Sequence, residues 1–225
     1  MDRRRISKAI FIIIAAAASL VILVPGVAAA QDLDPMGGCG QLDNAYGPFD
    51  YTNARDVAKK LPRVEKAHFD IGVQQLTGHR SKVFTWANLA ADIDYTLRAF
   101  PNHHMALYAM TQYYLEGYDK QYPMRYSARC YFDRAKRNSP SDGSVYLVEG
   151  IYFARLGRLQ DSENSYLTAI NMMPTSSEAR YNLGLLYLEM KNYPAAREQA
   201  LKAYEIGYPM PGLRNKLQAL GQWEN

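Results

Sequence analysis

Residues 177–209 read SEARYNLGLLYLEMKNYPAAREQALKAYEIGYP, and this stretch decides the fold. Its first half places large apolar side chains at helical spacing, and its second half places alanines at intervals of four and three residues: Leu183, Leu186 and Tyr187, then Ala196, Ala200 and Ala203. Between the two halves, residues 191–194 have the composition of a turn, and Pro194 suits the first turn of a following helix. The stretch predicts a hairpin of two amphipathic helices, each burying one face.

This hairpin recurs along the chain with a period of 34 residues. Gly150 precedes Gly184, and Ala169 precedes Ala203, by 34 positions in each case. Weaker copies of the apolar pattern predict helices further upstream, over residues 64–76, 86–100, 103–115 and 126–140. A fixed period of this size indicates hairpins that stack and bury a continuous core. We expect four helical pairs, two clear and two degenerate, and no strand.

The two clear units resemble the tetratricopeptide repeat. Residues 177–209 carry the family's small and aromatic positions and depart from them where Ala200 replaces an aromatic residue: Leu183-Gly184, Tyr187, Ala196 and Ala203 match. The resemblance implies an all-α, right-handed solenoid whose first helices line a concave, protein-binding face. Carried over position by position, it implies ten residues that face a ligand: Leu147, Ile151, Ala154, Arg155, Glu178, Tyr181, Asn182, Leu185, Leu188 and Glu189.

These signals divide the chain into five segments. They are a signal peptide over residues 1–30, an extended leader with Gly and Pro over 31–62, degenerate helical pairs over 63–141, the two clear units over 143–210, and a capping helix and tail over 211–225. A capping helix is expected because the end of a solenoid needs a polar outer face. Residues 47–51, 92–95 and 100–104 are similar to a group of exported Gram-negative tetratricopeptide proteins.

The N-terminus has the order of an export signal. Arginines at positions 3–5 precede an apolar run over residues 9–24, which is followed by Pro25-Gly26 and by three alanines that end at Ala30. We expect cleavage after Ala30 and a periplasmic or secreted chain. The alternative is an uncleaved segment that anchors the chain in the inner membrane, because a bilayer is spanned by about 20 apolar residues.

The charge balance excludes a strongly basic nucleic-acid binder. The chain has 26 Lys and Arg against 22 Asp and Glu, and its first 30 residues hold four of the basic groups and one acid. The rest of the chain is therefore close to neutral and creates little field to attract phosphates.

No phosphate-binding Gly-rich loop, G-x-S-x-G motif or H-E-x-x-H motif is present. We expect no catalytic residue, no metal site and no cofactor.

Two polar features leave an enzymatic alternative open. Cys39 and Cys130 are the chain's two cysteines, and an oxidising compartment would permit one disulfide between them. His103 and His104 are adjacent, so on a helix their rings point about 100° apart and cannot share a metal ion as residues at i and i+4 do. We expect the pair at a helix N-terminus, with one ring packed and the other exposed. The alternative is a thiol- or metal-dependent enzyme that uses Cys39, His103 and His104.

Tyrosines are concentrated in one of the degenerate units: Tyr108, Tyr113, Tyr114, Tyr118, Tyr122, Tyr126 and Tyr131. A tyrosine combines an apolar ring with a hydrogen-bonding tip, which suits a protein-contact surface. Aromatic residues at repeat spacing equally indicate a core. The sequence leaves both interpretations open.

The function that the sequence favours is protein binding. We expect an adaptor or scaffold in an envelope assembly that docks a peptide or helix of an unidentified protein on its concave face, with tyrosines as anchors. A membrane-anchored structural subunit of an envelope complex is a further alternative. Nucleic acid is not an expected partner.

Overall fold

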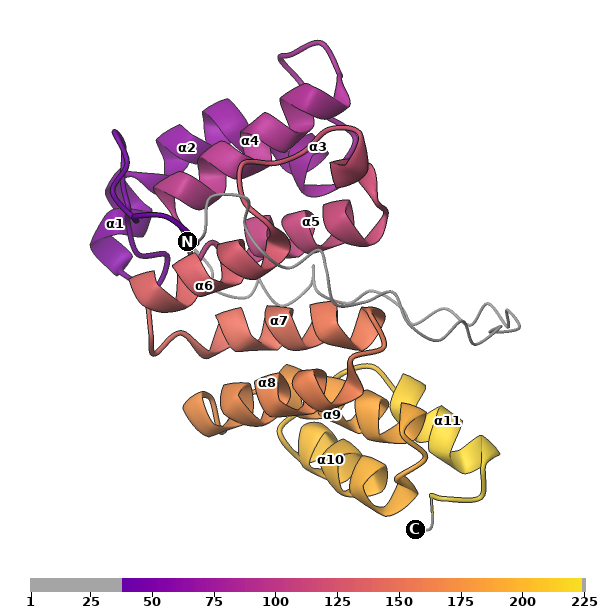
Figure 1. The fold of residues 1–225 in the computed structure, drawn as a ribbon. Coiled ribbons are helices and arrows are strands. Elements are labelled where there is room, and N and C mark those ends of the chain that lie inside the picture. Colours follow the sequence, from indigo (N-terminus) through magenta and orange to yellow (C-terminus); the bar gives the residue numbers. More distant parts are fainter. Residues whose placement is uncertain (1–37, 224–225) are drawn as a thin grey trace. The chain divides into compact units, whose positions relative to one another are not determined.

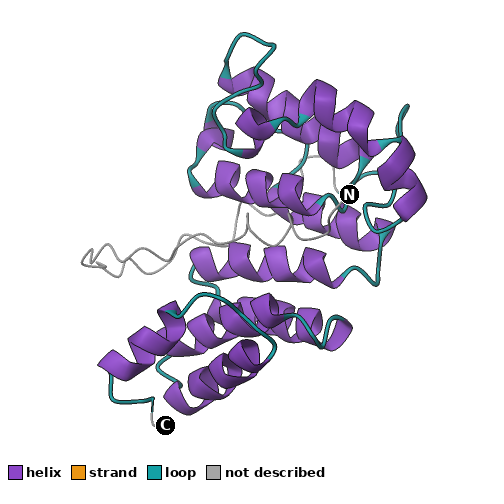
Figure 2. Cartoon of the chain, turned by 180° about the vertical axis from the view of Figure 1, so that it is seen from behind, coloured by secondary structure: helices purple, strands orange, loops and turns teal. Residues whose placement is uncertain are grey.

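The computed structural model describes residues 38–223, which belong to one compact unit. Within the described residues every regular element is a helix and no strand occurs (Figures 1 and 2). The prediction of an all-α solenoid is confirmed. The expected signal peptide lies outside the described residues. Between residues 38 and 223, no helix has the length and apolarity needed to span a membrane.

The two clear units form the hairpins that the sequence predicts. Their helices are α7 (Gly143–Arg155) packed on α8 (Leu159–Met172), and α9 (Ser177–Glu189) packed on α10 (Tyr193–Glu205). The first helix of each hairpin begins at a capping side chain. Asp142 accepts a hydrogen bond from a backbone N–H of α7, and Ser176 does the same for α9. Such caps satisfy amide groups that a helix leaves unpaired at its start.

Glycine sets how closely these helices approach. A Cβ atom at Gly150 would lie 2.5 Å from the ring of Tyr166 on α8. A Cβ atom at Gly184 would lie 2.5 Å from a methyl carbon of Leu213 and 3.3 Å from the carbonyl oxygen of Ala196 on α10. Leu213 belongs to α11 (Gly212–Ala219), the predicted capping helix. Gly184 therefore makes room for both the partner helix and the cap.

The upstream pairs are less regular than the two clear units. α4 (Trp86–Ala99), α5 (His104–Leu115) and α6 (Ala128–Asn138) follow the predicted helices, and a short 3-10 helix, η2 (Tyr118–Lys120), lies between α5 and α6. The helix predicted over residues 64–76 is instead two, α2 (Leu61–His68) and α3 (Ile71–Gln74). Asp70 causes the break, because its side chain accepts hydrogen bonds from the amides of Gly72 and Val73 and so starts a new helix.

The leader is partly helical. Residues 38–53 contain no regular element, but α1 (Ala54–Lys59) begins at Asn53, whose side chain accepts hydrogen bonds from two backbone N–H groups. The prediction of an extended leader over 31–62 is therefore wrong from Ala54 onward. An asparagine in capping position, followed by a run without Gly or Pro, is the local signal for this helix.

A disulfide and a buried arginine attach the leader to α6. Cys39 and Cys130 form the disulfide that the sequence permits. Arg134 is 1% exposed, and its guanidinium donates hydrogen bonds to the carbonyl oxygens of Cys39 at 3.1 Å and Gln41 at 2.5 Å. A buried cation is costly unless it is hydrogen-bonded. The leader therefore supplies acceptors that the helical body needs.

The crowded tyrosines belong mainly to the core. Tyr113 and Tyr131 are at most 1% exposed, Tyr108 is 9% exposed, and the other four pack against the same cluster. The buried hydroxyls have partners, since Tyr131 donates to Asp94 at 2.6 Å and Tyr113 donates to the carbonyl oxygen of Tyr122 at 2.8 Å. The three buried tyrosines are therefore core residues and cannot serve as binding anchors, whereas the other four are half-buried and pack on that core from its edge.

Candidate protein-binding surface

The first helices of successive pairs lie next to one another. α5 packs on α7, α7 packs on α9, and α9 packs on the capping helix α11. Figure 1 shows α7 between the α5–α6 pair and the helices of the following hairpins. The helices α5, α7 and α9 therefore form a continuous row, which we call the first-helix row. All ten ligand-facing candidates lie on α7 or α9 of this row.

Two of the ten candidates are not available to a ligand. Leu147 is 3% exposed and packs in the core with Ala179 and Leu183. Tyr181 is 8% exposed, its ring stacks on Tyr208 at a centroid distance of 3.9 Å, and its hydroxyl accepts a hydrogen bond from the amide of Leu213 at 3.1 Å. Leu147 is thus a core residue, and Tyr181 holds the capping helix in place.

The other eight candidates reach the surface. Two are exposed and six are half-buried: Arg155 and Glu189, then Ile151, Ala154, Glu178, Asn182, Leu185 and Leu188. The buried sides of Ile151 and Ala154 rest on the core between α7 and α9. Within the described residues, no hydrogen bond or ion pair holds the side chain of Arg155 or Glu189. The row therefore presents a strip of apolar side chains with unpaired charges beside it.

Glu178 has an unusual environment on this row. Burial raises the pKa of its carboxyl to about 7, and no basic side chain of the described residues pairs with it. Its negative charge in turn contributes to raising the pKa values of Tyr166 and Tyr208, for which burial is the largest cause. The carboxyl lies in the first turn of α9, where the helix dipole favours an anion. At neutral pH this group is poised between its two protonation states.

His103 and His104 lie at the start of α5, as predicted, and both have structural partners. His103 is fully buried, its Nδ1 accepts a hydrogen bond from the amide of Ala106 at 3.2 Å, and its Nε2 lies 3.3 Å from a carboxylate oxygen of Glu65. Burial lowers the pKa of His103, so the neutral ring donates from Nε2 to Glu65. His104 is partly exposed, and its Nε2 lies 2.7 Å from a carboxylate oxygen of Asp142, the cap of α7.

The three residues of the enzymatic alternative are therefore engaged in holding the fold. Cys39 is oxidised in its disulfide with Cys130 on α6. His103 joins α5 to Glu65 on α2, and His104 joins α5 to Asp142, the cap of α7. Among residues 38–223 no free cysteine occurs, and no three His, Cys, Asp or Glu side chains are grouped as a metal site would require.

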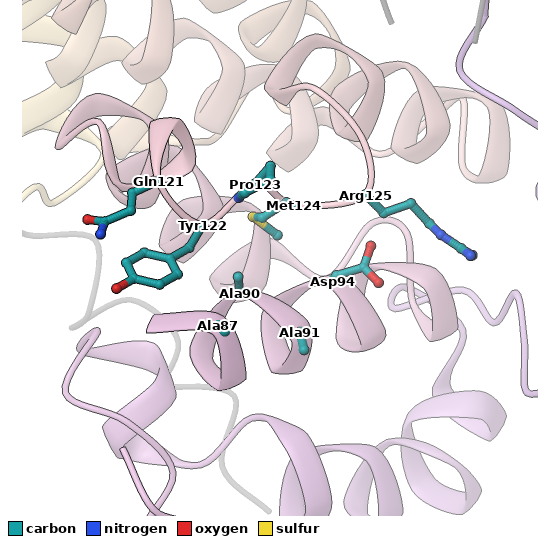
Figure 3. Close-up of a pocket in the computed structure, with 9 residues that line it drawn as sticks. All are labelled: Ala87, Ala90, Ala91, Asp94, Gln121, Tyr122, Pro123, Met124 and Arg125. Carbon is teal, nitrogen blue, oxygen red and sulfur yellow. The ribbon is translucent and has the colours of Figure 1, made fainter. Parts of the chain in front are cut away.

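A pocket of about 340 Å³ lies beside α4, where the sequence predicts no site (Figure 3). Alanines of α4 form its floor, and the loop 121–125 passes over it, with Tyr122 at one end and Arg125 at the other. Asp94 also lines the pocket, but its carboxylate already accepts hydrogen bonds from Tyr131 and Arg98. The spacing of the alanines at positions 87, 90 and 91 is the only sequence signal for this floor, and it is common to many helices.

Comparison with known proteins identifies the repeat. Residues 165–198 match the family model of the tetratricopeptide repeat, a segment that runs from α8 through α9 into α10. No curated protein matches the chain significantly. Among solved structures, one described as MamA MSR-1 C2 is similar, with 14% sequence identity and a TM-score of 0.41 over 68% of this chain and 97% of that chain.

Proposed function

We propose that this chain, which carries the tetratricopeptide repeat, is an adaptor or scaffold of the cell envelope that docks a peptide or helix of another protein on its first-helix row. One observation carries the proposal. Ile151 and Ala154 on α7 lie on the same row as Leu185 and Leu188 on α9, and all four are half-exposed. Protein interfaces have such a centre of apolar side chains within a polar rim.

The unpaired charges beside the apolar strip would set the orientation of the bound segment. Arg155 ends α7, and Glu189 ends α9. Rim charges contribute more to the rate and specificity of association than to affinity. The apolar side chains of the row therefore supply the affinity, and Arg155 and Glu189 select the direction in which a peptide lies.

Export is part of the same proposal. The order of the N-terminal segment supports it, and so does the disulfide between Cys39 and Cys130, because structural disulfides persist in oxidising compartments. We propose cleavage after Ala30 and a periplasmic or secreted chain. Sequencing the N-terminus of the protein recovered from cells tests this step. Recovery of the intact Met1 terminus in the membrane fraction would replace it with the anchored form.

Site-directed photo-crosslinking in intact cells tests the docking surface. A photoreactive amino acid at Leu188 lies on the first-helix row, and the same amino acid at Leu201, which is 47% exposed on α10, serves as the matched control. We expect a discrete crosslinked protein from position 188, to be identified by mass spectrometry, and none from position 201. Equal crosslinking from both positions, or none from position 188, would contradict the proposed surface.

A further inference from the structure

A second pocket, of about 280 Å³, lies on the first helix pair, and we call it the α2 pocket. It is lined by side chains from the leader, from α2 and from α4: Tyr46, Arg63, Val64, Ala67, His68 and Tyr95. None of these six side chains is acidic. The α2 pocket therefore offers hydrogen-bond donors and a positive charge, with no carboxylate in its wall.

His68 and Tyr95 form a rigid wall of this pocket. Their rings stack at a centroid distance of 3.9 Å, and His68 Nδ1 lies 2.7 Å from a carboxylate oxygen of Asp92. Asp92 is 4% exposed and also accepts a hydrogen bond from Lys82, so its charge is compensated within the fold. The carboxylate behind the wall therefore does not repel an anion in the pocket.

The donors of the pocket have no acceptor within the fold. Arg63 is exposed, its guanidinium lies 5.4 Å from the centroid of the Tyr46 ring, and no acid among the described residues pairs with it. The hydroxyls of Tyr46 and Tyr95 likewise form no hydrogen bond within the described residues. A guanidinium beside two phenols suits a carboxylate, which a guanidinium can bind through two parallel hydrogen bonds.

Basic residues are frequent along α1 and α2, the part of the chain that supplies Arg63 to the pocket. Arg55, Lys59, Lys60, Arg63 and Lys66 form no ion pair within the described residues. The two acids of the same stretch accept hydrogen bonds from neutral donors, Asp56 from the amide of Asp50 and Glu65 from His103, so both keep their negative charge. Five basic side chains against these two acids leave a net charge of 5 − 2 = +3 along α1 and α2, which is more than one small anion requires. It matches a chain segment that carries several negative charges.

We propose that the α2 pocket binds an acidic side chain of a partner protein, with Arg63 and the hydroxyls of Tyr46 and Tyr95 as its ligands. The net positive charge of α1 and α2 attracts the acidic segment around that side chain. This contact lies on a different helix pair from the first-helix row and does not depend on it.

Other polyanions fit the site less well. A membrane surface is bound through exposed apolar side chains next to basic ones. In the described part of the chain, no exposed large apolar side chain lies on α1 or α2. A single-stranded nucleic acid needs free aromatic faces on which to stack its bases. The ring of Tyr95 is stacked on His68, and that of Tyr46 packs against Phe49 at 5.0 Å.

Fluorescence anisotropy with a labelled hexaglutamate peptide tests the proposal on the chain purified from cells. Arg63→Gln should weaken peptide binding by about tenfold, the loss expected for one charge-assisted contact. Lys191→Gln removes the same charge from the exposed turn between α9 and α10, and it should change the affinity by less than about twofold. Tyr95→Phe keeps the ring stack but removes a hydroxyl, and it should weaken binding severalfold. Circular dichroism checks that each variant is folded.

Four outcomes would overturn the proposal. The peptide fails to bind the wild-type chain, or Lys191→Gln weakens binding as much as Arg63→Gln does, which would indicate diffuse charge attraction. Inorganic phosphate at equal ionic strength displaces the peptide at similar concentration, which would indicate a small-anion site. Vesicles of anionic phospholipid bind the wild-type chain while the peptide does not, which would indicate a membrane surface.

Discussion

Gly150→Ala is the sharpest test of how the hairpins pack. Glycine inside a helix is normally unfavourable, and replacing it by alanine stabilises an exposed helix by about 1 kcal/mol. At Gly150 the added Cβ would lie 2.5 Å from two ring carbons of Tyr166. Tyr166 is 2% exposed, so its ring cannot swing into solvent to give way. Packing therefore predicts that Gly150→Ala lowers the free energy of unfolding, whereas helix propensity alone predicts that it raises it.

The magnitude follows from the size of the overlap. Carbon atoms pack at about 3.5–4.0 Å, so the Tyr166 ring must retreat by more than 1 Å or α7 and α8 must separate by that amount. Inserting one carbon into a close-packed core costs about 1–3 kcal/mol, and part of this cost is offset by the better helix propensity of alanine. We expect a net loss of up to about 2 kcal/mol in the free energy of unfolding.

Urea unfolding followed by circular dichroism measures this loss, and a double-mutant cycle with Tyr166→Leu assigns it. The smaller side chain should remove the overlap, so Gly150→Ala should cost much less in that background. Gly184→Ala is a second comparison, because its nearest obstacle is a flexible methyl of Leu213. Two results would contradict this reasoning: Gly150→Ala stabilises the chain, or it lowers the free energy of unfolding equally in the wild-type and Tyr166→Leu backgrounds. Either result would show that the close approach of α7 and α8 does not require glycine at position 150.

Three further predictions concern the leader and two titrating groups. The Cys39–Cys130 bond spans 91 positions, so its reduction should lower the free energy of unfolding by about 4 kcal/mol. Urea titrations with and without dithiothreitol measure this loss. A loss below about 1 kcal/mol would show that the bond does not constrain the leader. The pKa of Glu178 is raised from 4.5 to about 7, so the wild type loses stability as pH rises between these values; Glu178→Gln should match the wild type at pH 4.5 and exceed it at pH 8. Burial lowers the pKa of His103 below 6.5, so acidification below pH 6.5 should destabilise the wild type more than His103→Asn, and equal slopes would contradict a neutral buried ring.

Helical pairing was predictable from the sequence because its cause is local. The 34-residue period and the alanines of residues 196–203 reflect the same contact made repeatedly, so one hairpin predicts the next. The break at Asp70 and the helix that begins at Asn53 were harder to predict. Each depends on one polar side chain that caps a helix where the apolar pattern continues or is absent.

The candidate surface was only partly predictable, because family offsets place a residue on a helix but do not show what covers it. Leu147 and Tyr181 occupy positions that the resemblance assigns to a ligand, yet both are buried. Tyr181 is covered by Tyr208 and α11, which come from later in the chain. The α2 pocket was missed for the same reason, since Tyr46, Arg63 and Tyr95 come from three separate segments.

The cover over Tyr181 also limits what the first-helix row can bind. Because α11 packs on α9 and the Tyr181 hydroxyl is taken by Leu213, the row ends at the capping helix. The accessible apolar strip consists of four half-buried side chains, from Ile151 and Ala154 on α7 to Leu185 and Leu188 on α9, and a few apolar side chains on one face of a partner helix can cover them. A partner with a longer apolar face would need to displace α11, which the buried contacts of Leu213 oppose. The fold therefore favours a short apolar segment at this surface, and a partner that extends further must use a separate contact such as the α2 pocket.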